Sequence, residues 1–153
     1  MMKNRRRNSF ALLILAAGLL VLVAVLGSFW KEAAIWTDFT RKNLAPCIRY
    51  PFGTDWMGRD MFVRTIAGLS LSIRIGLLTA AVSAAAAFLM GLCAAVCGKA
   101  ADSIVQMLID IVMGIPHMLL LILISFACGR GFWCVVWGSA FTHWASLARL
   151  IRG

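Results

Sequence analysis

Two long stretches without a charged residue constrain this chain more than any other feature. They cover residues 10–29 and 75–98, and each matches the roughly 20 residues that a helix needs to cross a bilayer. The composition agrees, because 62% of the residues are hydrophobic, only 14% are charged and the mean hydropathy is +0.90. A soluble protein of this length would not have this composition. The sequence therefore predicts an all-α polytopic membrane protein.

Four transmembrane helices are predicted in all. The two uncharged stretches supply the first and the second, and residues 103–128 and 132–148 supply the third and the fourth. The predicted division of the chain is residues 1–30, a basic N-terminus with the first span; residues 31–74, an extracytoplasmic connector; and residues 75–153, the start of a transmembrane domain.

Basic residues before the first span set the expected orientation. They are Lys3, Arg5, Arg6 and Arg7. Because basic flanks stay on the cytoplasmic side, the N-terminus of this multi-pass protein is expected in the cytoplasm. A cleaved signal peptide is the alternative, but its apolar core would be shorter, roughly 7–15 residues. The connector is then expected outside, although its basic residues outnumber its acidic ones.

Neither the charge nor the cysteines indicate a soluble binding function. The net charge is +9, but the 15 Lys and Arg residues are scattered between apolar runs and do not pattern one face for nucleic acid. The five cysteines are an odd number, and Cys93 and Cys97 lie inside an apolar run. They are expected to pack as small hydrophobic residues. Membrane lipid is expected to surround the protein, and no nucleic acid partner is expected.

A turn rich in glycine and aspartate precedes the second span. Its characteristic residues are Gly53, Thr54, Asp55, Gly58, Arg59 and Asp60. The glycines supply backbone freedom, and the two aspartates carry short acceptors suited to cap the start of a helix. Asp60 and Arg64 then stand at i,i+4, on an amphipathic helix predicted for residues 61–72 at the outer membrane surface.

Three motifs give the chain a family resemblance. The first is the turn just described, continued by Arg64, Gly68 and residues 70–77; the second is residues 107–116; the third is residues 143–152. In this order and spacing they resemble the permease subunits of ABC importers of the dipeptide, oligopeptide and nickel type. The resemblance covers nearly everything from Pro51 onward.

The resemblance implies a transport function without catalysis in this chain. It implies a permease fold and ATP-driven uptake of peptides, nickel or other small solutes. The expected partners are a sister permease subunit, two cytoplasmic ATPase subunits and an extracytoplasmic substrate-binding protein. The sequence has no Gly-x-x-x-x-Gly-Lys-Ser/Thr phosphate loop, so ATP hydrolysis is expected in a separate subunit. No catalytic residue, cofactor or metal is expected here.

The resemblance also predicts a missing segment. In this family the position after Arg149 and Arg152 leads into a cytoplasmic loop that docks on the ATPase, and further spans follow. The sequence stops at Gly153. We therefore expect a fragment, a truncated gene product or a gene split between two frames, and a truncated remnant without transport is an alternative.

A polar stripe runs through the predicted third span. Gln106 and Asp110 are four residues apart, and His117 is expected to continue their face. Pro116 removes a backbone donor and predicts a kink where the stripe ends. An acidic residue inside a span costs several kcal/mol unless it faces water or a partner. The stripe therefore lines the translocation pathway or makes a structural bond to another helix, and we favour the structural interpretation.

Two rival functions use the same residues. A secondary transporter would use Asp110 as a proton or cation site without an ATPase. An integral-membrane enzyme would use His117, His143 and a metal, because imidazole suits nickel, copper and zinc. The spacing of the histidines and cysteines forms no recognised metal motif, so the enzyme ranks below the secondary transporter, and the importer ranks above both.

Overall fold

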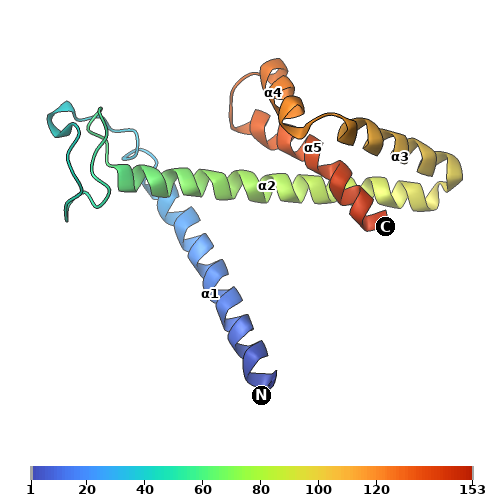
Figure 1. Cartoon of the computed structure of the whole chain (residues 1–153), viewed down its shortest axis with the longest axis horizontal. Coiled ribbons are helices and arrows are strands. Elements are labelled where there is room, and N and C mark those ends of the chain that lie inside the picture. Colours follow the sequence, from blue (N-terminus) through green and yellow to red (C-terminus); the bar gives the residue numbers. More distant parts are fainter. Residues whose placement is uncertain (1, 153) are drawn as a thin grey trace. The chain divides into compact units, whose positions relative to one another are not determined.

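The computed structural model is an all-α protein whose described part comprises residues 2–152, with side chains described for residues 8–151. It forms two compact units, which meet in sequence between Arg74 and Ile75. In chain order (Figure 1), the elements are α1 Met2–Phe29, the short 3-10 helix η1 Phe39–Arg41, α2 Met61–Val96, α3 Gly98–Gly114, α4 His117–Cys128 and α5 Phe132–Arg152.

In the first unit, α1 contacts the beginning of α2 near its own C-terminal end. Gly27 lies so close to α2 that a Cβ atom there would be 2.6 Å from the carbonyl oxygen of Ile66. The hydroxyl of Ser70 donates a hydrogen bond of 2.8 Å to the carbonyl oxygen of Ala24. Small residues thus allow the two backbones to approach closely, as is common between membrane helices.

The predicted outer helix and the second span form one continuous helix. α2 extends over 36 residues, from Met61 to Val96, and no turn separates residues 61–72 from the span that follows. Nothing in the sequence between Ser72 and Gly76 removes a backbone donor or forces a turn. At about 1.5 Å per residue, α2 is considerably longer than the roughly 30 Å hydrocarbon core of a bilayer.

In the second unit, α5 packs against both α3 and α4. Alanine residues of α5 meet branched residues of α3: Ala145, Ala148 and Ile109 have no exposed surface. The hydroxyl of Ser83 in α2 donates a hydrogen bond of 3.2 Å to the carbonyl oxygen of Ala140 in α5. The buried cluster consists of Ala87, Ala94, Val105, Ile109, Trp144, Ala145 and Ala148.

The predicted third span is broken into two helices. α3 ends at Gly114 and α4 begins at His117, and their axes are bent by 91°. Ile115 has an extended backbone, with φ −92° and ψ 131°, as the residue before a proline prefers. The break therefore lies where Pro116 predicted a kink, but it is a full interruption of the helix.

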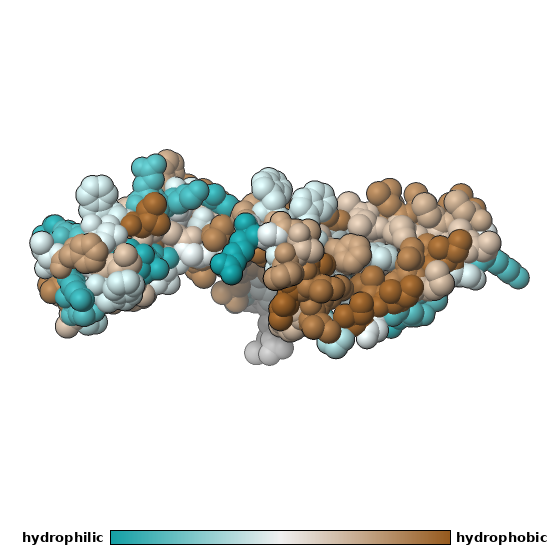
Figure 2. Space-filling model, turned by 90° about the horizontal axis from the view of Figure 1, so that it is seen from above, coloured by the Kyte–Doolittle hydropathy of each residue, from teal (hydrophilic) through white to brown (hydrophobic). Residues whose placement is uncertain are grey.

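The membrane-spanning character is confirmed, whereas the number of four spans is not. In the described part of the chain, residues 8–29 and α2 are long and apolar enough to cross a membrane, and the bent α3–α4 pair would be a third span if counted as one. α5 does not meet the same criterion, since polar residues such as Thr142 and His143 interrupt its apolar surface. Figure 2 shows hydrophilic residues over the connector and hydrophobic ones over the helices of the second unit.

Candidate functional site

The turn before α2 has two glycines in the left-handed region of backbone conformation. Gly53 has φ 70° and Gly58 has φ 74°. A Cβ atom at Gly58 would collide with the carbonyl oxygen of Asp38, and one at Gly53 would lie 2.5 Å from that of Leu44. Both positions therefore require glycine for conformation and for space, and the prediction that they supply backbone freedom is confirmed.

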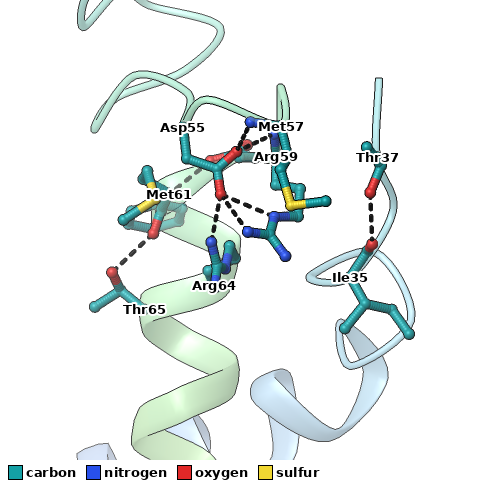
Figure 3. A network of polar contacts seen from close by, with 10 residues as sticks. Ile35, Thr37, Asp55, Met57, Arg59, Met61, Arg64 and Thr65 are labelled. Atoms are coloured by element: carbon teal, nitrogen blue, oxygen red, sulfur yellow. Dashed lines mark hydrogen bonds and ion pairs between the residues drawn. The ribbon is translucent and has the colours of Figure 1, made fainter. Parts of the chain in front are cut away.

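Asp55 is the centre of the turn. One carboxylate oxygen accepts the backbone N–H groups of Met57 at 2.9 Å and of Arg59 at 3.0 Å. The other oxygen lies 2.8 Å from both Nε and Nη2 of the Arg59 side chain and also pairs with Nη1 of Arg64 (Figure 3). The Asp55 side chain is only 11% exposed. One carboxylate thus joins the turn to the first helical turns of α2.

The surroundings of Asp55 favour its ionised form. Burial is the largest single influence and raises the pKa, but the hydrogen bonds from the backbone and side chain of Arg59 and from the backbone of Met57 together outweigh it. They lower the pKa of Asp55 from 3.8 to about 2. The carboxylate is consequently charged at every physiological pH and serves as a fixed anchor for its two arginines.

Asp60 caps α2 as predicted. Its Oδ1 accepts the N–H of Phe62 at 2.8 Å and that of Val63 at 3.3 Å, which satisfies donors that have no partner within the helix. Arg64 stands four residues after Asp60 but forms its ion pair with Asp55. Asp55 in turn caps no helix, because its acceptors bind the turn and the two arginines.

Thr54 fastens the turn to the preceding segment. Its side chain is buried, and its hydroxyl accepts the N–H of Leu44 at 2.9 Å and donates to the carbonyl oxygen of Arg41. The backbone adds bonds from the N–H of Asp38 to the carbonyl oxygen of Met57, 3.2 Å, and from Asn43 to Asp55, 3.0 Å. The connector is therefore a folded unit and not a loose loop.

Sequence reasoning missed the contribution of Asp38 and Arg41. Asp38 caps η1 through Thr40, and its other oxygen pairs with Nε of Arg41 at 3.0 Å. The hydrogen bond from the Thr40 hydroxyl is the main cause that lowers the pKa of Asp38. Arg41 also donates to the Tyr50 hydroxyl, 2.8 Å. The Asp-x-Thr pattern at residues 38–40 is typical of a capped turn and could have revealed this contact.

A cavity of about 460 Å³ opens beside this turn. It has both charged and aromatic walls, and its lining includes Glu32, Trp36, Asp38, Arg41, Tyr50, Gly58 and Asp60. These side chains offer hydrogen bonds, charge and a flat apolar surface, which suits recognition of a partner or solute. They form no arrangement of nucleophile and base.

The predicted polar stripe is divided by the break after α3. Gln106 and Asp110 lie on α3 and line one shallow cavity of about 660 Å³. His117 lies beyond the bend, on α4, so it does not continue their helix face. Its ring instead contacts the ring of His143 on α5, edge to face, with centroids 4.8 Å apart.

Asp110 has a partner from a distant part of the chain. Nη2 of Arg149, on α5, lies 2.6 Å from its Oδ1, and the two side chains are 56% (Asp110) and 49% (Arg149) exposed. The side chain of Arg152 lies outside the described residues. Within residues 8–151, no group of three or more histidine, cysteine or acidic side chains could hold a metal ion, and the His117–His143 pair stands without a third such residue.

These features define a helical membrane protein with a folded polar connector. Among known proteins, the chain is 31% identical over 157 residues to the dipeptide transport system permease protein DppC of Bacillus subtilis, with 99% of this chain and 48% of the relative aligned. It is 29% identical to the oligopeptide transport system permease protein OppC of the same organism, over 97% of this chain and 49% of the relative. The glutathione transport system permease protein GsiD of Pectobacterium atrosepticum is 31% identical over 90% of this chain and 48% of the relative.

The chain is thus homologous to the permease proteins of peptide-type transport systems, which confirms the resemblance found in its motifs. It spans about half the length of these curated relatives. No family model matches the chain.

Proposed function

We propose that this chain forms part of the transmembrane permease of an ABC importer that takes up peptides. The observation that carries the proposal is the homology to a dipeptide permease protein over 99% of the chain. The relatives described above are named for dipeptides, oligopeptides and glutathione, so peptides are the preferred substrate class. Nickel or another small solute stays a prediction from the motifs.

The proposed assembly pairs this chain with subunits that it does not contain. A sister permease, two cytoplasmic ATPases and an extracytoplasmic binding protein complete it. In this scheme the N-terminus lies in the cytoplasm, the bent α3–α4 pair counts as one span and α5 as the fourth. The scheme is supported by the basic N-terminus and by the apolar helices, and it gives this chain no catalytic role.

The outer turn is proposed to frame the entrance or to meet the binding protein. Its support is the rigidity described above, because a surface fixed by the Asp55 ion pairs can contact a partner without losing entropy on ordering. Replacing Asp55 and Arg59 by alanine together should abolish stimulation by the binding protein. Normal stimulation in that double variant would contradict this role, and Arg49→Ala, at an exposed position of the same connector, is the matched control.

Asp110 is proposed to act structurally, because its carboxylate is already paired with Arg149. The alternative, a lining residue of the pathway together with Gln106, predicts a different phenotype. Under the structural proposal, Asp110→Asn lowers the amount of folded permease and leaves the preference among dipeptides unchanged. An altered preference at normal abundance would favour the pathway.

The main test is uptake in the native organism. Deleting the gene should abolish ATP-dependent uptake of a labelled dipeptide, the full native gene should restore it, and the tagged protein should co-purify with ATPase subunits from detergent extracts. A proline uptake system measured in the same cells controls for general energisation. Unchanged dipeptide uptake in the deletion strain would overturn the proposal, as would uptake that survives ATP depletion but collapses with the proton gradient.

A further inference from the structure

The Asp110–Arg149 pair joins the C-terminal half of α3 to the last turns of α5. The two residues are separated by 39 positions in sequence, and their charged atoms are 2.6 Å apart. The contact is one charge-assisted hydrogen bond, from Nη2 of Arg149 to Oδ1 of Asp110, and such a bond is shorter and stronger than one between neutral groups. The pair therefore depends on the position of one helix along the other as well as on the distance between them.

Beside the pair, the buried interface has alanines on the α5 side, and Val105 and Trp144 belong to the same buried cluster. Ile109 and Ala148, each next to one of the charged residues, are fully buried, as is Ala145. Alanine allows close approach, but its single methyl group interlocks weakly with the facing helix. A shift of one residue moves a helix by about 1.5 Å along its axis and a shift of one turn by about 5.4 Å. The alanines would accommodate either movement more easily than the ion pair would.

We propose that the Asp110–Arg149 pair sets the axial register of α5 on α3, and that this register couples ATP hydrolysis to transport. The inference rests on the proposed permease function and on the family resemblance, which implies that a cytoplasmic loop after Arg149 and Arg152 docks on the ATPase. Asp110 and Arg149 are then positioning residues: they touch neither nucleotide nor substrate, but they hold the end of α5 where a movement of the ATPase can be passed to α3.

The first test measures coupling in the full importer reconstituted in proteoliposomes. Compared at equal amounts of folded complex, Asp110→Asn and Arg149→Gln should keep basal ATPase activity but transport less dipeptide per ATP hydrolysed, by about 3- to 30-fold, as expected for coupling residues. The double exchange Asp110→Arg with Arg149→Asp should restore most of this ratio. Arg130→Gln, in the turn before α5, is the matched control. An unchanged ratio in the single variants, or no rescue by the exchange, overturns the proposal.

The second test measures register directly and does not depend on transport. Spin labels on cysteines placed at Ile104 in α3 and Leu150 in α5, both exposed, in a background without the native cysteines, report the distance between the helices in nanodiscs. The distance distribution should broaden or shift in Arg149→Gln and return in the double exchange. An unaltered distribution overturns the register claim, whereas a wild-type importer without ATP-driven uptake would overturn the proposed function alone.

Discussion

Replacing Gly58 with alanine should open the turn before α2 by a predictable amount. The new methyl group would collide with the carbonyl oxygen of Asp38, a backbone atom that cannot rotate away. The residue would also stay in the left-handed region, at φ 74°. The segment carrying Asp38 must then move and lose the hydrogen bond from its N–H to the carbonyl oxygen of Met57.

The two costs can be added for an order of magnitude. The left-handed conformation costs a residue with a Cβ atom roughly 1–2 kcal/mol, and a lost backbone hydrogen bond costs about 0.5–1.5 kcal/mol. A total of about 1.5–3.5 kcal/mol corresponds to a roughly 10- to 300-fold larger opening equilibrium, because 1.4 kcal/mol is tenfold.

Hydrogen–deuterium exchange in nanodiscs measures this opening. Peptides covering residues 38–60 should lose protection by that factor in Gly58→Ala. Gly68→Ala is the matched control: it adds the same methyl group to the same unit, inside α2, where nothing lies within 4 Å. It should leave the connector unchanged and stabilise α2 by up to about 1 kcal/mol. Equal exchange of residues 38–60 in the two variants would refute the reasoning.

Three further predictions follow from the described contacts. Because the pKa of Asp55 is lowered from 3.8 to about 2, its stabilisation of the connector is complete above pH 3.8 and is lost as the pH falls toward 2. Amide exchange rates of the connector, corrected for their intrinsic pH dependence, should show this loss. A loss of protection already at pH 5 would contradict the prediction. Asp60→Ala should destabilise the first turn of α2 by about 1 kcal/mol, whereas Asp60→Asn should not. Equal amide exchange of this turn in the two variants would refute the capping role of Asp60. Pro116→Ala restores a backbone donor and should reduce the 91° bend between α3 and α4. Spin labels at Ile104 and Ile122 would then lie farther apart. An unchanged distance between the labels would mean that helix packing causes the bend.

Local signals predicted the fold well where one residue decides the backbone. Pro116 predicted the position of the break after α3, although as a kink; Asp60 predicted the start of α2, and the glycines predicted the tight turn. The uncharged stretches predicted α1 and α2. In each case the signal depends on neighbours in sequence, because caps, turns and proline act over a few residues.

Contacts between distant residues could not be predicted in the same way. Arg64 had a suitable acceptor four residues away in Asp60, yet it pairs with Asp55, because the turn folds the Asp55 carboxylate over the beginning of α2. Arg149 could not be identified as the partner of Asp110 without knowing that α5 packs on α3. His117 was placed on the wrong helix face, because a kink was expected where the chain makes a bend of 91°.

The connector holds its fold without a disulfide bond. Its ordering relies on ion pairs, caps and backbone bonds, whereas Cys47 is a free, exposed thiol and the only cysteine before residue 93. Reducing agents should therefore leave the connector intact. The same thiol offers a native attachment point for a membrane-impermeant maleimide, so that the side of the membrane on which the connector lies can be read by labelling intact cells.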